Sequence, residues 1–131
     1  MRVVALDHIV LAVADVERSL SWYGEVVGLE PVRVDEWRAG QAPFPSVRID
    51  ATTIIDLVSA TGPLAGSGNL DHFCLVCEVP GTADLMAWAT ASGLQVIEGP
   101  DERFGARGIA TSIYVKDPDG NTVEFRYYQA S

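Results

Sequence analysis

The chain has 131 residues, 48% of them hydrophobic, which is enough for one buried core and too little for a second large one. Nine basic and eighteen acidic residues give a net charge of −9, which disfavours nucleic acid and anionic membrane surfaces as partners. The first residues do not form a secretory signal, and no run approaches the roughly 20 apolar residues of a membrane span. The composition therefore predicts one soluble, cytoplasmic domain over residues 1–131.

The first half of the chain predicts a strand, a helix and three more strands. "LDHIVLAV" at 6–13 is an apolar strand, and Asp15 suits the N-cap of a helix. Apolar residues recur at helical spacing after Asp15, and Gly28 ends the pattern. Extended segments are expected next, at 29–36, 45–51 and 53–59.

The second half repeats this order after a linker, 61–69, that is rich in Gly, Pro and Ser. "LDHFCLVC" at 70–77 begins a strand that we expect to reach Val79, and a helix should lie between Pro80 and Gly93. Further extended segments follow at 95–98, 108–116 and 121–128, the last two joined by the turn "KDPDGN".

The two halves match closely enough to indicate an internal duplication. Both histidines of the chain, His8 and His72, follow a Leu-Asp pair and are 64 residues apart. The glycines that end the two predicted helices are 65 residues apart, so the register survives each helix. We therefore expect an α+β fold of two tandem β-α-β-β-β modules, with repeat one at 5–60 and repeat two at 70–128.

Cys74 and Cys77 form a C-x-x-C pattern that invites a zinc or redox interpretation. Both lie in an apolar, strand-like run with no turn residue between them, so the thiols should point to opposite faces of a sheet. Two buried free cysteines are the better interpretation.

The repeats also match at their last strands, where "TIIDLV" carries Asp56 and "NTVEFR" carries Glu124. Each half thus supplies one histidine on its first strand and one carboxylate on its last. Imidazole suits Zn, Ni, Co, Fe or Mn, and carboxylates extend the set to the harder of these ions. If two such halves pack around a twofold axis, the sequence predicts a divalent metal site of His8, His72, Glu124 and Asp56.

An ordinary structural role is the alternative for each of these residues taken singly. A lone strand histidine is more often a satisfied core or surface residue than a ligand, and a strand glutamate more often faces solvent. Matched placement in both halves favours the metal for His8, His72 and Glu124. Asp56, one methylene shorter, is left open as a ligand.

The double β-α-β-β-β plan, "LDHFCLVCE" and above all "GARGIATSIYVKDPDGNTVEF" resemble the vicinal oxygen chelate superfamily, which includes glyoxalases, bleomycin-binding and fosfomycin-resistance proteins and extradiol dioxygenases. The resemblance implies a cupped, incomplete eight-stranded mixed β-barrel with its helices outside. It places the metal ligands at His8, His72 and Glu124. Asp56 falls where lactoylglutathione lyases carry a Glu that is both ligand and base.

The resemblance also implies a mechanism and an assembly. The metal would act as a Lewis acid on two neighbouring substrate oxygens, while Glu124 or Asp56 moves a proton. Superfamily members of this length often form homodimers whose sites lie at the subunit interface, but the halves would equally pair within one chain. Arg103 and Arg107 are candidates for contact with a small-molecule substrate, and a thiol cosubstrate is possible.

Several functions fit such a site. A lactoylglutathione-lyase-like lyase or isomerase uses four ligand-type residues in these four places. An extradiol dioxygenase normally needs a further histidine, and the sequence has two in all. A fosfomycin-type transferase would need a basic cluster. A metal-free binding protein of the bleomycin-sequestering kind would use the same cup as a pocket, lined by aromatics such as Trp22, Trp37 and Tyr114.

Overall fold

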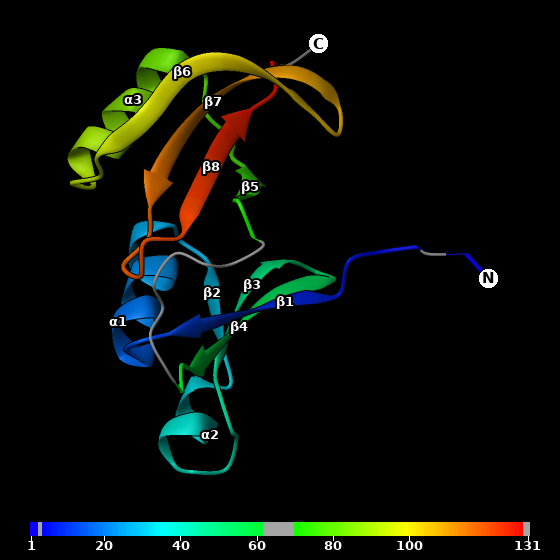
Figure 1. Cartoon of the computed structure of the whole chain (residues 1–131), viewed down its shortest axis with the longest axis vertical. Coiled ribbons are helices and arrows are strands. Elements are labelled where there is room, and N and C mark those ends of the chain that lie inside the picture. The colour runs from blue at the N-terminus through cyan, green and yellow to red at the C-terminus, as the bar shows by residue number, and fades with distance from the viewer. Residues whose placement is uncertain (3, 62–69, 130–131) are drawn as a thin grey trace. The chain divides into compact units, whose positions relative to one another are not determined.

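The computed structural model describes residues 1–2, 4–61 and 70–129. The chain divides into two compact units, Met1–Gly66 and Ser67–Ser131, which correspond to the two predicted repeats (Figure 1). Most of the predicted linker lies outside the described residues. Whether the two units form the single domain predicted from composition stays a prediction. In the described part of the chain, every helix is too short or too polar to cross a membrane.

The first unit is a four-stranded sheet with its helices between the strands in sequence. Its order in space is β1-β4-β3-β2, with β1 parallel to β4 and the other neighbours antiparallel. The elements are β1 (His8–Val13), α1 (Val16–Ser21), the π-helix η1 (Trp22–Val26), β2 (Glu30–Val32), α2 (Val34–Arg38), β3 (Ser46–Asp50) and β4 (Thr53–Ser59).

The second unit has the same topology. Its strand order is β5-β8-β7-β6, again with the first pair parallel and the others antiparallel. Two four-stranded mixed sheets with a few helices confirm the predicted α+β class. The elements are β5 (Phe73–Val76), α3 (Thr82–Ala91), β6 (Val96–Gly105), β7 (Gly108–Lys116) and β8 (Thr122–Tyr127).

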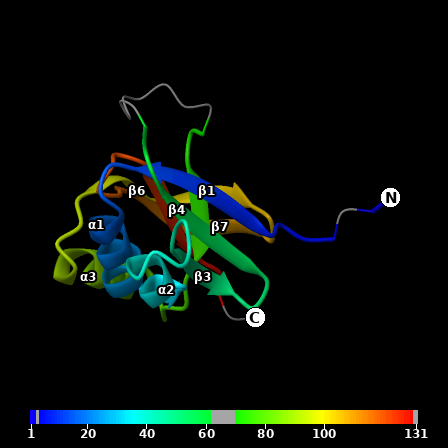
Figure 2. The same ribbon diagram turned by 90° about the horizontal axis from the view of Figure 1, so that it is seen from below.

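Helix α1 covers one face of the first sheet (Figure 2). The helix begins where the Asp15 carboxylate accepts the Arg18 backbone N–H at 3.1 Å, and the chain leaves the helical path at Gly28, whose φ of 89° suits glycine. Apolar side chains of the helices and of alternate strand positions are buried between the two layers: Leu11, Val13, Val16, Leu20, Tyr23, Val47, Ile55 and Leu57.

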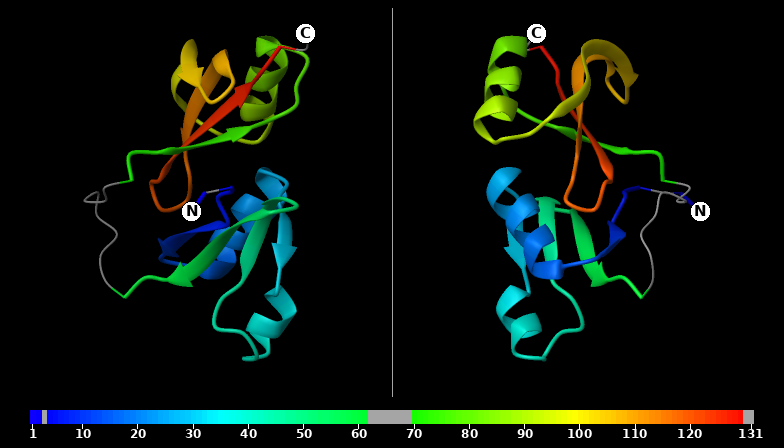
Figure 3. Two further views of the ribbon diagram at one scale, coloured as in Figure 1. Left: turned by 90° about the vertical axis from the view of Figure 1, so that its right-hand side faces the viewer. Right: turned by 60° about the vertical axis from the view of Figure 1, so that its left-hand side comes forward.

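Helix α3 lies along one face of the second sheet (Figure 3). The ring of Trp88 meets Phe125 edge to face at 4.9 Å, and the hydroxyls of Thr82 and Tyr127 are hydrogen-bonded at 2.6 Å. The core of this unit is formed by the buried side chains of Leu75, Leu85, Ala89, Ile113, Val115, Val123, Phe125 and Tyr127.

The predicted turn between the last two strands is organised by one buried carboxylate. Asp117 accepts the backbone N–H groups of Asp119 and Asn121 at 2.9 and 2.8 Å, and also the Asn121 side-chain amide at 2.8 Å. Gly120 takes the positive φ of 82° that closes the turn. Strand β8 therefore starts from a fixed position.

Three predicted segments differ from the structure. The extended segment 29–36 ends at Val32 and gives way to α2, because Arg33 adopts a left-handed conformation, with φ of 59°, that turns the chain. Strand β5 ends at Val76 rather than Val79. The segment 95–98 continues as β6 to Gly105, because two register shifts let Gly99 and Pro100 lie within the strand.

The two cysteines are free, as predicted, but neither belongs to the buried core: Cys74 is exposed and Cys77 is half-buried. The prediction of buried thiols was wrong for a physical reason. Cys74 pairs in register with Glu124, so it lies on the sheet face opposite the helix, which its own unit leaves uncovered.

Candidate metal centre

The two candidate carboxylates lie on the sheet faces that the helices do not cover. Asp56 stands between the fully buried Ile55 and Leu57, and Glu124 stands between the buried Val123 and Phe125. Because successive strand residues point to opposite faces, a carboxylate between two core residues must point away from the core.

Strand register brings each histidine beside its carboxylate in the same way. Ile9, which follows His8, pairs with Ile55, the residue before Asp56. Phe73, which follows His72, pairs with Val123, the residue before Glu124. The parallel pairing of first and last strands therefore places His8 with Asp56 in one unit and His72 with Glu124 in the other.

The pair in the second unit is close. His72 Nε2 lies 3.0 Å from Glu124 Oε1, and His72 Nδ1 lies 2.7 Å from the Asp71 carboxylate. The ring of Tyr114, on the neighbouring strand β7, packs edge to face against the imidazole at 5.4 Å. The imidazole is thus fixed at both nitrogens and along its ring edge.

In the first unit the histidine and the carboxylate lie farther apart. His8 Nδ1 lies 2.8 Å from the Asp7 carboxylate, but His8 Nε2 is 3.8 Å from Asp56 Oδ2, which is beyond a hydrogen bond. The hydrogen bond that His8 Nδ1–H donates to Asp7, reinforced by the charge of Asp56, raises the pKa of His8. The protonated imidazole is therefore favoured at His8.

These contacts fit a divalent ion. When Nδ1–H donates to an aspartate, the neutral imidazole has its lone pair on Nε2, facing a carboxylate oxygen. Two lone pairs in contact need a cation between them, and either a proton or a metal supplies it. Each unit, however, offers one imidazole nitrogen and one facing carboxylate oxygen at this point, and the described residues contain no group of three or more His, Cys, Asp or Glu side chains that could hold a metal ion.

Glu124 is held from behind by a serine and an arginine. Its Oε2 accepts hydrogen bonds from Ser112 Oγ at 2.6 Å and from Arg126 Nη2 at 2.8 Å. Burial would raise the pKa of Glu124, but these hydrogen bonds outweigh burial and hold the pKa below its usual range. The carboxylate is charged, and only Oε1 faces His72.

Asp56 has a similar arrangement. Its Oδ1 accepts a hydrogen bond from Ser46 Oγ at 2.6 Å, and Ser46 Oγ in turn accepts one from Arg33 Nη2 at 2.6 Å. The guanidinium lies 3.7 Å from Oδ1 itself. The other oxygen, Oδ2, is the one that faces His8.

The two predicted substrate arginines lie on the β6–β7 hairpin. Arg103 is engaged with Glu98 at 2.8 Å and with Asp101 at 3.4 Å. Arg107, at the turn, stacks over the ring of Tyr128 at 5.2 Å. Contact of either side chain with a substrate stays a prediction.

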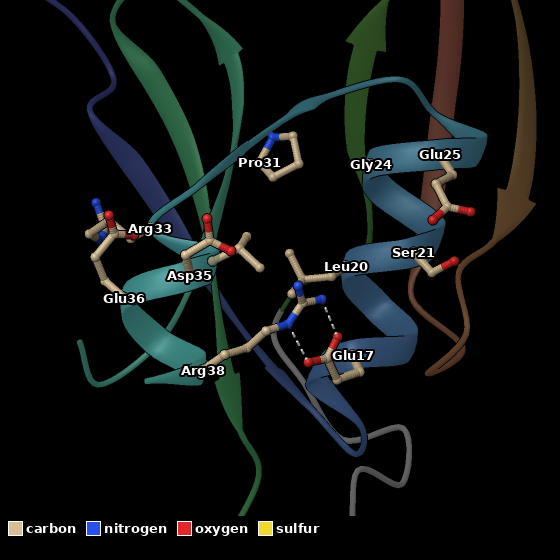
Figure 4. Close-up of a pocket in the computed structure, with 11 residues that line it drawn as sticks. Glu17, Leu20, Ser21, Gly24, Glu25, Pro31, Arg33, Asp35, Glu36 and Arg38 are labelled. Carbon is tan, nitrogen blue, oxygen red and sulfur yellow. Dashed lines mark hydrogen bonds and ion pairs between the residues drawn. The ribbon is translucent and has the colours of Figure 1, made fainter. Parts of the chain in front are cut away.

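A groove of about 590 Å³ lies in the first unit between α1 and α2 (Figure 4). Arg38 and Glu17 point toward one another across it and form two hydrogen bonds of 2.8 and 2.7 Å. Arg33 lines the groove as well, but its guanidinium donates a hydrogen bond to Ser46, which lies beside Asp56. The acidic groove walls provide no ligand set of their own.

The sequence interpretation missed the residues that support these pairs. Asp7 and Asp71 stand within the repeated Leu-Asp-His, so the duplication carried the signal for them. Ser46, Ser112, Arg33 and Arg126 carry no such signal, because their contacts depend on cross-strand register and on the backbone turn at Arg33.

A family model and several known proteins are similar to this chain over most of its length. The model of the Glyoxalase/Bleomycin resistance protein/Dioxygenase superfamily matches residues 5–125. Virulence protein STM3117 of Salmonella typhimurium is 32% identical over 124 residues, which cover 94% of this chain and 83% of that protein. The glyoxalase domain-containing protein RDO1 of Mycosarcoma maydis is 31% identical over 125 residues, covering 95% and 69%.

Solved structures share the fold. An integron cassette protein from the mobile metagenome of V. cholerae superposes with a TM-score of 0.78 at 28% identity, covering 98% of both chains. At lower identity, the fold is shared with lactoylglutathione lyase of Agrobacterium tumefaciens, at TM-score 0.62 and 20% identity over 94% and 92% of the chains. It is also shared with TnmS3, an antibiotic-binding protein of Streptomyces, at 0.69 and 21% over 97% and 98%.

Proposed function

The chain belongs to the Glyoxalase/Bleomycin resistance protein/Dioxygenase superfamily, and we propose that it is a divalent-metal-dependent enzyme of the glyoxalase type. The reaction would be a lyase or isomerase reaction on a small substrate with two neighbouring oxygens. One observation carries the proposal: a histidine–carboxylate pair occurs at the equivalent place in both units, and in each unit an aspartate contacts Nδ1 of the histidine.

The proposed ligands are His8 and His72 through Nε2, Glu124 through Oε1 and Asp56 through Oδ2. A divalent ion bound there would supply Lewis-acid chemistry and stabilise negative charge that develops on substrate oxygens. Asp56 is the better candidate to move a proton, because its Oδ2 lies 3.8 Å from His8 Nε2, beyond a hydrogen bond. Oε1 of Glu124, in contrast, lies within hydrogen-bond distance of His72 Nε2, at 3.0 Å. A thiol cosubstrate is compatible with this chemistry.

Since each unit offers half of the ligands, we propose that two pairs join in one centre. They would come either from the two units of one chain or from the units of two chains in a homodimer with two shared sites. Either arrangement would cover the open face of each four-stranded unit, and the homodimer with shared sites is the one that we put to the test.

A second candidate, a small-molecule binding protein that needs no metal, has one observation in its favour. Both ring nitrogens of His72 already face carboxylates, so a proton alone satisfies the pair. TnmS3, which shares the fold, is an antibiotic-binding protein. The two candidates differ in metal uptake, which can be measured before any substrate is known.

The test is the metal content of protein purified without chelators, followed by titration of the metal-free form with Ni²⁺, Zn²⁺ and Mn²⁺. The enzyme proposal expects one ion per complete ligand set. His72→Ala, Glu124→Ala and His8→Ala should each weaken binding at least about a hundredfold, since each removes a ligand. Asp56→Ala should have a smaller effect. Wild-type protein that takes up no ion, or ligand variants that bind as wild type does, would favour the metal-free candidate.

A further inference from the structure

The β6–β7 hairpin of the second unit extends beyond the strand that supports it (Figure 1). Pairing between β7 and β8 ends at Thr111↔Tyr127, whereas β6 and β7 stay paired as far as Gly105↔Gly108. Among the described strands, residues 103–110, which we call the arm, therefore pair only with each other. A two-stranded ribbon is marginally stable in water, so other contacts must hold the arm in place.

The outer side of the arm contributes little to holding it. Phe104 pairs with Ile109, so their side chains share one side of the hairpin. In the described part of the chain these side chains are 87% and 57% exposed. Burial of apolar surface on this side therefore stabilises the arm only weakly.

The inner side of the arm lies against Arg126. This residue is two positions after Glu124 on β8 and so shares the sheet face that α3 does not cover. A methyl group at Gly105 would overlap the Arg126 guanidinium and lie 2.6 Å from the Tyr128 hydroxyl, so only glycine allows this approach. The Arg126 side chain is 4% exposed, and the arm is part of what buries it.

Arg126 and Tyr128 make the polar contacts that hold the arm. Arg126 Nη2 donates to the Phe104 carbonyl at 3.0 Å, and the Arg107 backbone N–H donates to the Tyr128 hydroxyl at 3.2 Å. The Arg107 guanidinium also stacks over the Tyr128 ring at 5.2 Å. A segment held by a few polar contacts opens at a lower free energy than a packed sheet does.

We propose that the arm is a lid on the open face of the second unit, held closed by Arg126 and Tyr128, and that it opens while the four-stranded sheet stays intact. Opening removes the Phe104 carbonyl from Arg126 and exposes the guanidinium beside Glu124. The inference does not depend on the proposed metal, because every contact that carries it lies within the second unit.

Trypsin tests the proposal on the full chain, because it cleaves after arginine. Cleavage after Arg107 requires this side chain to leave Tyr128, so it reports opening of the arm. Cleavage after Arg126, which is buried in β8, reports unfolding of the sheet. Each rate is followed by mass spectrometry and divided by the rate in urea-unfolded protein. In wild type, the normalised rate after Arg107 should be at least about tenfold the rate after Arg126.

Two variants should open the arm. Tyr128→Phe removes the acceptor of the Arg107 N–H and should raise the rate after Arg107 about fivefold. Tyr127→Phe is its matched control: it removes a hydroxyl that is bonded to Thr82 and should leave that rate within about twofold of wild type.

Gly105→Ala forces the arm away from Arg126 and should raise the rate after Arg107 by about tenfold or more. Gly81→Ala, where the nearest atom to the added methyl group is 3.9 Å away, is its control. These results together support the lid. Equal normalised rates after Arg107 and Arg126 in wild type would mean that the arm opens only when the sheet unfolds, which overturns the proposal. A rate after Arg107 that stays at the wild-type level in Tyr128→Phe or Gly105→Ala also overturns it, because the assigned contacts would not hold the arm.

Discussion

At the scale of single residues, the proposed centre depends on two histidines, each with an aspartate at Nδ1 and a second carboxylate facing Nε2. An aspartate at Nδ1 fixes the tautomer and the orientation of the ring, and it raises the basicity of Nε2. The His72–Asp71 distance of 2.7 Å and the His8–Asp7 distance of 2.8 Å show that both rings are held in this way. In both repeats an aspartate stands directly before the histidine, and this order thus has a chemical reason.

Asp71→Asn and Asp7→Asn should each weaken divalent metal binding by about tenfold, because a carboxamide is a weaker acceptor for Nδ1–H and leaves the ring less well oriented. The measurement is calorimetric titration of metal-free protein with Zn²⁺. Asp35→Asn, on α2, removes the same charge from an exposed helix position and should bind as wild type does. Equal loss in all three variants would show that overall charge, and not the contact with histidine, controls binding.

Cys74 should be a poor nucleophile. Although Cys74 as a whole residue is exposed, its sulfur is partly buried, and this desolvation together with the charge of Glu124 raises the pKa of the Cys74 thiol to about 12. A raised thiol pKa leaves less thiolate at a given pH, so alkylation by iodoacetamide at pH 8 should be roughly a thousandfold slower than for a thiol of ordinary pKa. The rate, followed by mass spectrometry on metal-free folded protein, should rise about tenfold per pH unit up to pH 11.

Unfolded protein is the control for Cys74, since unfolding removes the neighbouring carboxylate and restores an ordinary pKa. Cys74→Ser assigns the remaining signal to Cys77. A rate that levels off below pH 10 in the folded protein would contradict the environment of Cys74 described here.

At the scale of elements, the turn between β7 and β8 sets the position of Glu124. Asp117, buried in that turn, accepts three hydrogen bonds from Asp119 and Asn121. From this anchor β8 runs antiparallel to β7 in unbroken register from Lys116↔Thr122 to Thr111↔Tyr127. The Asp117 carboxylate therefore helps to fix the position of Glu124, a proposed ligand, on the strand that follows the turn.

Asp117→Ala should lower the free energy of unfolding by about 2 kcal/mol, because it leaves several donors of the turn without their acceptor. Urea denaturation followed by circular dichroism measures the change. Glu102→Ala, an exposed position on β6, is the control and should stay within about 0.5 kcal/mol of wild type. An equally small effect of Asp117→Ala would show that the turn is held by its backbone alone.

Some of these helices and strands could be predicted from the sequence, and others could not. The first strands, both main helices and the last hairpin follow apolar periodicity with clear caps and breakers, and all are present. Helix α2 has only five residues, and Arg33 at its N-cap makes no side-chain capping bond, so no signal marks it. Strand β6 contains Gly99, Pro100 and several charges, which are typical of a loop; only pairing with β7 makes it a strand.

At the scale of the whole molecule, duplication gives each unit one histidine–carboxylate pair, half of the proposed metal site. The histidines and carboxylates could be predicted because repetition gave them matching places in the sequence. The serine and arginine contacts could not, since strand register and one unusual backbone conformation create them. What joins the two halves of the site is a matter of assembly, and the homodimer with shared sites remains the proposal to test.

Complementation between two inactive variants tests that assembly. In the proposed homodimer, His8 and Asp56 of one subunit meet His72 and Glu124 of the other. A dimer of one His8→Ala subunit and one Glu124→Ala subunit then has both defects in one site and none in the second. Random exchange makes half of the dimers mixed, so metal binding or activity should return to about a quarter of the wild-type level, by the twofold symmetry of the interface. Two His8→Ala subunits labelled differently, mixed in the same way, control for exchange. If the two units of one chain supplied each site, every chain in the mixture would keep its own defect, and proven exchange without recovery would rule out the shared centre.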